Sequence, residues 1–299
     1  MDSTAIKEVR VVLRQVQEHL FNAHLQLGAQ WETLGLVDVV HHPTTSIPDL
    51  NYVTPRRNTA WVPGPEIQSG LNHLQQFERT PRVQYIEGLF PPMFAKTLRD
   101  LHLEIERETP IMVYKADGFN GVFPQEPKMP DVPDGVTIEA VTDQRGLELW
   151  WYVWRNAFYE VLTLGVEPLF VGRDLKGLKN GYHFDYLAMR GNSPVGVVRV
   201  SVHGTTAHLL ALALLKEART PDMIQLLQLT AMQAALERGC TMIFAPGETD
   251  ADRRLCREIG FMDTGSMVCY SARSADNSAG PGEEASSNAM EQHFLTPRW

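Results

Sequence analysis

The sequence predicts a mixed α/β (α+β) fold in two units, each with a β-sheet flanked by helices. Strand-like runs of apolar and β-branched residues alternate with segments in which apolar residues recur every three or four positions, the spacing of an amphipathic helix. Residues 123–135 hold four prolines in thirteen positions and divide these patterns into two halves. Because proline fixes φ and removes a backbone donor, we expect this segment to be an extended linker.

The composition limits the class of protein. With 299 residues, of which 43% are hydrophobic, the chain is long enough for two domains with sizeable cores. A net charge of −9 argues against a broad nucleic-acid surface, which needs clustered Lys and Arg. No apolar run is long enough to cross a membrane and the first residues lack a secretory pattern, so we expect a cytoplasmic protein without a membrane partner. The three cysteines have neither disulfide nor zinc spacing, and we expect no metal site.

The first half of the chain is predicted to mix helices and strands. An apolar stripe from Val9 to Leu27 predicts a helix over Ile6–Leu27. The other expected elements are a strand at Leu50–Thr54, a helix at Gly64–Gln76 with Pro65 in its first turn, a strand at Arg82–Ile86, a helix from Pro92 toward His102, and a strand at Pro110–Tyr114.

The second half has a more regular pattern, in the order β-α-β-β-β-α-β-α-β. Its expected strands are Thr137–Ala140, Tyr182–Arg190, Val195–His203, Ala207–Leu215, Thr241–Ala245 and Met267–Ser271. Its expected helices are Leu147–Leu164, Asp222–Arg238 and Asp250–Ile259. The very apolar run Ala207–Leu215 is typical of a strand at the centre of a sheet.

Four segments of this half carry a resemblance to a known family. They are Pro194–Val200, a strand after a tight turn; Ala207–Arg219, a central strand with the loop after it; Ala234–Gly239, an Ala-rich helix end; and Arg253–Phe261, a helix that closes on Gly-Phe. Together with the order of the elements, they resemble the GNAT superfamily of acyl-CoA N-acyltransferases. The resemblance implies a mixed, mostly antiparallel sheet flanked by helices over residues 136–271.

The first half resembles a shortened, degenerate unit of the same kind. The similar segments are Ile47–Val53 and Pro110–Val113, and some family members carry such a unit fused before the active one. The resemblance therefore implies a tandem arrangement: a degenerate GNAT-like domain at 1–122, the linker at 123–135 and a GNAT domain at 136–271. Residues 272–299 have few large apolar side chains, and we expect a disordered tail there.

In the family, a loop of pattern Arg/Gln-x-x-Gly-x-Gly/Ala holds the CoA pyrophosphate through backbone N–H groups and the dipole of the following helix. The aligned residues here are Arg-Thr-Pro-Asp-Met-Ile at 219–224, so the arginine is retained and both glycines are replaced. The resemblance implies acetyl-CoA or another acyl-CoA as cosubstrate. The binding residues it implies are Leu212, Leu214, Arg219, Thr220, Met223 and Ile224. The two leucines would serve if the central strand is splayed from its neighbour and leaves a slot for pantetheine.

The same residues also predict an ordinary helix start. Thr220 is suited to the N-cap, Pro221 to the first helical position and Asp222 to the second. The Asp222 carboxylate would then satisfy the positive helix end that pyrophosphate normally occupies. Losing two or three charge-assisted hydrogen bonds costs about 1.5–3 kcal/mol each, so we expect weakened CoA binding. The loop is either a weakened cofactor loop or a helix cap in a fold that no longer binds CoA.

Four residues are candidates for the chemistry of acyl transfer. His208 is the titratable residue in Ala207–Leu215, and it matches the place where some family members have their general base. It is otherwise a structural histidine at a strand edge. Cys256 stands where the family usually has the Tyr that protonates the departing thiolate, although a packed apolar Cys fits the same pattern. Tyr270 and Tyr182 are the alternative hydroxyls, and the sequence does not choose between them.

These observations predict an N-acyltransferase that moves an acyl group, in the first place acetyl, to a small amine. The donor would be acyl-CoA or the thioester of an acyl carrier protein, which presents pantetheine while relying less on the altered loop. The alternative is a GNAT fold that has lost CoA binding and now binds another ligand or carries out other chemistry. A structural or interaction role is a third hypothesis. The pair Asp222 and Ile224 separates the first two hypotheses.

Overall fold

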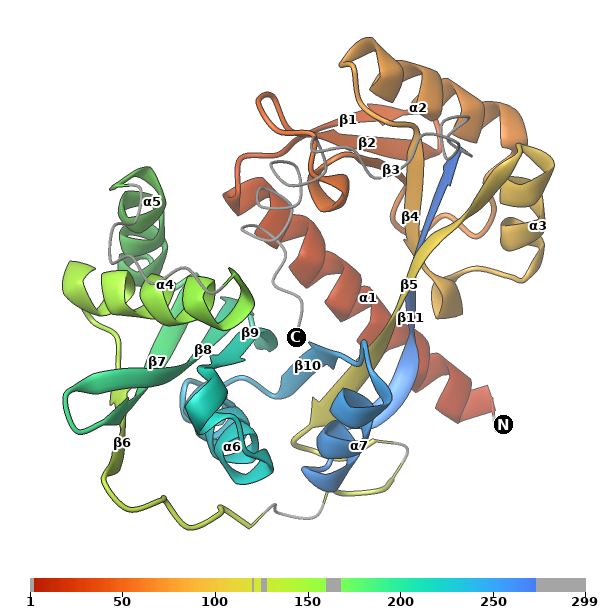
Figure 1. The fold of residues 1–299 in the computed structure, drawn as a ribbon. Coiled ribbons are helices and arrows are strands. Elements are labelled where there is room, and N and C mark those ends of the chain that lie inside the picture. The colour runs from red at the N-terminus through yellow and green to blue at the C-terminus, as the bar shows by residue number, and fades with distance from the viewer. Residues whose placement is uncertain (1–2, 120, 125–127, 160–167, 273–299) are drawn as a thin grey trace. The chain divides into compact units, whose positions relative to one another are not determined.

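A computed structural model describes residues 3–119, 121–124, 128–159 and 168–272 of the chain (Figure 1). The chain divides into two compact units. Of the described residues, the first holds Ser3–Ile111 and Thr264–Ala272, and the second holds those within Met112–Asp263. Strand β5 therefore continues from one unit into the other, and these units are not the same segments as the domains expected at 1–122 and 136–271. The division into those domains stays a prediction, and the expected tail lies outside the described residues from position 273 on.

The first unit combines three helices with a sheet. Its helices are α1 (Ser3–Gln26), α2 (Gly64–Gln76) and α3 (Met93–Asp100), with short 3-10 turns at Pro48–Leu50 and Glu87–Leu89. Its strands are β1 (Gln30–Leu34), β2 (Val37–His41), β3 (Tyr52–Pro55), β4 (Arg82–Ile86), β5 (Leu103–Lys115) and β11 (Met262–Ala272). The strand order is β1-β2-β3-β4-β11-β5, with β3 and β4 parallel and β4 antiparallel to β11.

The sequence predicted most of these elements but missed one hairpin. The bounds of α2 and β4 are those expected, whereas β5 begins earlier than Pro110. Strands β1 and β2 were not expected. They form an antiparallel hairpin around Gly35, whose φ of 56° lies in the left-handed region that favours glycine. Strand β1 is largely exposed, so its sequence lacks the alternation that reveals a half-buried strand.

A buried histidine of α1 gives the first unit a predicted pH dependence. The His24 Nδ1 lies 2.9 Å from the Tyr52 hydroxyl, and burial lowers the pKa of His24 to about 4, with the Asp49 carboxylate opposing the shift. As the pH falls from 6.5 to 4, this imidazole takes up a proton in the unfolded chain before it does so in the folded chain. The contribution of His24 to the free energy of unfolding is therefore complete above pH 6.5 and is lost as the pH falls toward 4. We expect a loss of about 3 kcal/mol at pH 4.

Urea unfolding of the wild type and of His24→Gln at pH 7 and pH 4.5 measures this effect. Glutamine cannot titrate, so the variant should lose less stability between the two pH values than the wild type. The proposed contribution of His24 is contradicted if both proteins lose the same free energy of unfolding between pH 7 and pH 4.5.

The second unit is a five-stranded arrangement covered by four helices in the described part of the chain. Its strands are β6 (Val136–Ala140), β7 (His183–Arg190), β8 (Ser193–His203), β9 (Thr206–Leu214) and β10 (Met242–Pro246), in the order β6-β7-β8-β9-β10. Its helices are α4 (Gln144–Tyr159), α5 (Pro168–Lys179), α6 (Pro221–Glu237) and α7 (Asp250–Glu258), with a 3-10 turn at Lys216–Ala218. Strands β6 to β9 are antiparallel and β10 is parallel to β9, which confirms the predicted fold class.

Helix α5 is the element of this unit that the sequence did not predict. The expected helix over Leu147–Leu164 ends in the described residues at Tyr159, and α5 begins at Pro168. Gly172 and Gly177 lower the helix propensity of α5. Gly177 is required by packing, because a Cβ atom there would lie 2.7 Å from the Nε2 atom of His183.

The two faces of the β7–β9 sheet differ in polarity. Helix α6 covers one face, where Val198, Val200 and Leu209 join its Leu226 and Leu227 in an apolar core. On the other face, Arg199 contacts the Trp150 ring of α4 and Asp174 of α5. Because side chains alternate along a strand, the sheet turns charged residues toward α4 and α5. No helix within the described ranges has the length and apolar character needed to cross a membrane.

Candidate functional site

Four strands of the second unit place side chains in one row across the sheet. His183 of β7 is registered with Ser201 of β8, Ser201 with His208 of β9, and His208 with Phe244 of β10. Registered neighbours in a sheet project to the same face. We call these four residues, three of which have polar side chains, the polar row. The row lies on the face that carries Arg199.

His208 occupies the centre of the polar row. The residue is 9% exposed, and its imidazole stacks on the Phe244 ring with centroids 4.2 Å apart and planes 5° apart. The stack fixes the orientation of the imidazole on β9. The sequence placed His208 at the start of the central strand, and the structure puts it at the third residue of β9. Its role as a base stays a prediction.

The ladder between β9 and β10 is short and ends at His208. Its registered pairs are Met242 with Thr206, Ile243 with Ala207, and Phe244 with His208. Strand β10 ends at Pro246, which has no N–H to donate, while β9 continues to Leu214 with β8 as its registered partner in the described sheet. The β8–β9 register also shifts after Arg199, so that β9 bends just beyond His208. The expected pantetheine slot depends on this arrangement.

Leu212 and Leu214 belong to Leu209–Leu214, which we call the free stretch of β9 because it lies beyond the last residue registered with β10. Both are buried in the apolar core that includes Leu226 and Leu227 of α6. A ligand along this stretch would therefore meet the backbone of β9 rather than these two side chains.

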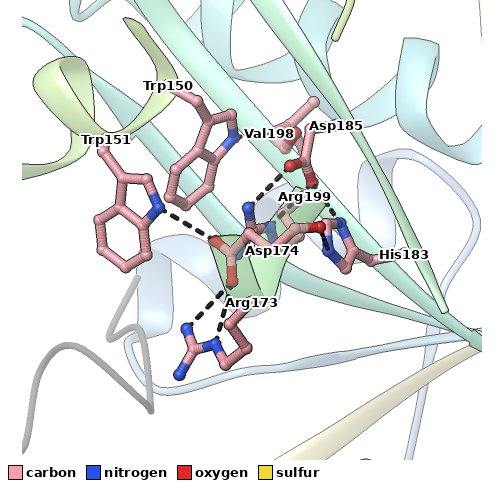
Figure 2. Close-up of polar contacts among 8 residues, drawn as sticks. All are labelled: Trp150, Trp151, Arg173, Asp174, His183, Asp185, Val198 and Arg199. Atoms are coloured by element: carbon pink, nitrogen blue, oxygen red, sulfur yellow. Dashed lines mark hydrogen bonds and ion pairs between the residues drawn. The ribbon is translucent and has the colours of Figure 1, made fainter. Parts of the chain in front are cut away.

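A buried charge network lies beside the polar row (Figure 2). Arg199 donates two hydrogen bonds to the Asp185 carboxylate, from Nε at 2.8 Å and from Nη2 at 2.7 Å, and one from Nη1 to Asp174 Oδ2 at 2.8 Å. Arg173 donates to the second oxygen of Asp174, and the Trp151 indole N–H donates to its Oδ2 at 3.0 Å. The network thus joins α4, α5, β7 and β8.

Burial makes the charges of this network depend on one another. Asp185 is 1% exposed and Arg199 is 7% exposed. Burial opposes both charges, but Arg199 and His183 hold the pKa of Asp185 at about 2, and the two carboxylates raise the pKa of Arg199. His183 faces an acceptor at each ring nitrogen, the Asp185 carboxylate at 3.2 Å and the Asp174 main-chain oxygen at 3.1 Å.

The aromatic residues of α4 cover the network. The Arg199 guanidinium lies 4.2 Å from the centroid of the Trp150 ring, which stacks on Trp154 with centroids 5.5 Å apart. Asp174, Asp185 and Arg199 were not predicted from the sequence as a group. The available signal was a charged residue at an inward position of each apolar strand, in Phe184–Leu187 and in Val197–Val202.

The start of α6 has the predicted cap. Thr220 is the N-cap, and its hydroxyl accepts a hydrogen bond from Met223 N at 3.3 Å, with Pro221 at the first helical position. The Met223 side chain is buried in the apolar core and Ile224 packs against that core. The Arg219 guanidinium donates to the main-chain oxygens of Leu214 and Ala157.

The remaining candidates lie in different parts of the fold. Cys256 of α7 is 1% exposed in the apolar core of the second unit, and burial raises the pKa of its thiol to about 12. Tyr270 belongs to the part of β11 in the first unit, where it is buried beside Tyr85 with ring centroids 6.2 Å apart. Tyr182 is exposed just before β7. The structure therefore does not bring Cys256 or Tyr270 into the polar row. In the described part of the chain, no group of three or more His, Cys, Asp or Glu residues is arranged to hold a metal ion.

Comparisons with known proteins show likeness in structure but not in sequence. No protein-family model matches the sequence, and no curated protein matches it. A GCN5-related N-acetyltransferase from Kribbella flavida is similar with a TM-score of 0.66 and 15% identity, over 92% of this chain and 98% of that one. A tandem GNAT protein from the clavulanic acid biosynthesis pathway is similar with a TM-score of 0.58 and 12% identity, over 92% and 97%. A third, a GCN5-related N-acetyltransferase from Sphaerobacter thermophilus, has a TM-score of 0.53 and 16% identity, over 80% and 81%.

Proposed function

We propose, from the premise that this chain has the fold of the GCN5-related N-acetyltransferases, that it is an N-acyltransferase acting on a small amine. The acyl donor is a thioester on a pantetheine arm, in the first place an acetyl thioester. The observation that carries the proposal is the end of the β9–β10 ladder at His208: beyond it, the edge of β9 that faces away from β8 has no registered strand partner in the described sheet, directly beside a fixed imidazole.

The free stretch of β9 suits an extended ligand that contains amides. A pantetheine arm has two amide groups, and such a chain can pair with a strand edge through main-chain hydrogen bonds. The residues that would hold it lie in Leu209–Leu214, by those backbone N–H and C=O groups that face away from β8. A backbone N–H of this stretch could also stabilise the negative charge that develops on the thioester oxygen.

His208 supplies the base in the proposed reaction. Its imidazole takes a proton from the ammonium form of the acceptor, and the neutral amine then attacks the thioester carbonyl. The C–N bond forms as the C–S bond breaks, and the second proton that the attacking nitrogen loses passes to the departing thiolate, so that an amide and a free thiol result. Cys256 is poorly suited to give that proton, because it is buried and its pKa is raised to about 12.

The remaining sequence predictions keep their place within this proposal. The similarity to a tandem GNAT protein, which extends over most of the chain, supports a tandem arrangement with a degenerate first unit. The proposed donor is carried by CoA or by an acyl carrier protein, and the cytoplasmic location stays a prediction.

A second function is favoured by one observation, the self-capped start of α6. If the fold has lost its donor altogether, the polar row would serve another ligand or another reaction. The Thr220 cap supports this alternative, because it takes up a backbone donor that a cofactor would need.

The test of acyl transfer is release of free thiol from acetyl-CoA and acetyl-pantetheine in the presence of a panel of primary amines. We expect release that depends on the amine, together with a thermal shift caused by the donor. A ligand at one hundred times its dissociation constant adds about 2.7 kcal/mol of stability. If millimolar donor gives no thiol release and no thermal shift, acyl transfer is rejected and the second function remains.

A further inference from the structure

We infer that the start of α6 offers the donor no pyrophosphate site, so that this chain accepts an acyl-pantetheine thioester without reading the nucleotide of CoA. The inference deepens the proposed function and rests on it. It concerns the chemistry that recognises the donor, which acyl-CoA and an acyl carrier protein share.

Four of the five backbone N–H groups of residues 219–224 are already used. Arg219 N donates to Lys216 O at 3.4 Å, Thr220 N to Ala218 O at 2.9 Å, and Ile224 N to Thr220 O at 3.1 Å. Met223 N donates to the Thr220 hydroxyl at 3.3 Å. Pro221 has no N–H. In the described structure, Asp222 is thus left as the one residue of this loop whose N–H has no protein acceptor.

The charge at this helix end is also unfavourable for an anion. Asp222 lies in the first turn of α6, where its carboxylate interacts favourably with the positive end of the helix dipole and repels a pyrophosphate. The retained Arg219 does not replace the backbone donors of the loop: its Nη2 donates at 3.2 Å to Leu214 O and at 3.4 Å to Ala157 O, which leaves only the other N–H groups of one exposed side chain for an anion.

Opening the loop to free these N–H groups would be energetically unfavourable. The side chain of Met223 is buried in the apolar core, and Ala218 before the loop is fully buried. Moving the backbone to expose its N–H groups would remove both residues from the core. The structure therefore separates two parts of donor recognition: the free backbone of β9 can still bind a pantetheine arm, whereas the nucleotide has no prepared site at α6.

The decisive measurement is the ratio of kcat/KM for acetyl-CoA to that for acetyl-pantetheine with one amine. Each charge-assisted hydrogen bond to a pyrophosphate contributes about tenfold to affinity. We expect a ratio below tenfold and no inhibition by millimolar adenosine 3′,5′-bisphosphate. A ratio above tenfold, or inhibition by this nucleotide that competes with acetyl-CoA, would overturn the inference.

A variant tests whether the self-capped start of α6 is the reason that acetyl-CoA is not preferred over acetyl-pantetheine. Thr220→Ala combined with Asp222→Gly frees the Met223 N–H and removes the carboxylate, so we expect at least a tenfold rise in the preference for acetyl-CoA. Thr249→Ala is the matched control, because Thr249 caps α7 in the same way and its loss should leave the ratio unchanged. An unchanged ratio in the double variant would refute self-capping as the cause.

Two further arms distinguish the donor source and separate this inference from the proposed function. A higher kcat/KM with an acetylated carrier protein than with acetyl-pantetheine would identify the carrier protein as the source, and equal values would show that the arm alone is recognised. If no thioester is consumed, the proposed function fails. Calorimetric titration with adenosine 3′,5′-bisphosphate and free CoA still tests the α6 site, since tight binding of the nucleotide would overturn the inference by itself.

Discussion

Replacing Arg199 by methionine is expected to lower the free energy of unfolding of the second unit by about 3–5 kcal/mol. The guanidinium neutralises two carboxylates that are almost fully buried, Asp185 and Asp174. Methionine fills much of the same space but leaves both charges without their main partner. The cost is therefore the desolvation of unpaired carboxylates rather than lost packing.

The measurement is urea unfolding followed by tryptophan fluorescence. Trp150, Trp151 and Trp154 are all buried beside the network, so their emission reports on this region. Arg199→Lys is the matched variant: it keeps the charge but loses the planar fork to Asp185, and we expect an intermediate loss. Combining Arg199→Met with Asp174→Asn and Asp185→Asn should recover most of the stability, because no buried charge is then unpaired. A loss below about 1 kcal/mol for Arg199→Met alone would contradict this account.

Replacing His208 by glutamine is expected to lower kcat/KM for acyl transfer by about 10²–10⁴. Glutamine keeps a polar planar group on β9 but cannot take the proton of an ammonium acceptor. The loss should fall mainly on kcat, with the KM for the donor within threefold of wild type, because the donor arm is assigned to the backbone of β9. Thiol release under saturating amine gives both constants.

The dependence on the amine separates a base from a structural residue. Alkylamines are protonated at neutral pH and need a base, whereas a weakly basic amine is already neutral and needs it less. The loss in His208→Gln should therefore be larger for the alkylamine. His73→Gln is the control, because it removes an imidazole from α2 of the first unit and leaves the four residues of the polar row unchanged. Equal losses for both amines would assign His208 a structural role.

The fold was predictable where local signals are strong. The proline at the start of α2 and the cap at Thr220 are encoded in neighbouring residues, and both helices begin within a residue of the predicted positions. The exposed hairpin β1–β2 has no such pattern. The last strand was expected at Met267–Ser271, but its sequence did not indicate that it pairs with β4, far away in the chain. Such long-range pairing leaves no trace in local periodicity.

The candidate site was predictable to a similar extent. His208 could be found because it interrupts an apolar strand, and the cap at α6 because its residues are adjacent. The charge network could not be assembled, because Arg199 meets partners fourteen and twenty-five positions away on two other elements. One of these elements, α5, was itself not expected. The position of a buried ion pair depends on tertiary packing, which the sequence pattern does not contain.

The close packing of Gly177 against His183 has a consequence for engineering a more heat-resistant form of the protein. Replacing a helical glycine by alanine commonly gains about 0.5–1 kcal/mol, because alanine loses less backbone freedom on folding. Helix α5 offers this gain at Gly172, where an added Cβ atom meets nothing within 4 Å. At Gly177 the same change would push the imidazole away from Asp185 and Asp174. Two glycines five residues apart in one helix are thus a free site for stabilisation and a forbidden one.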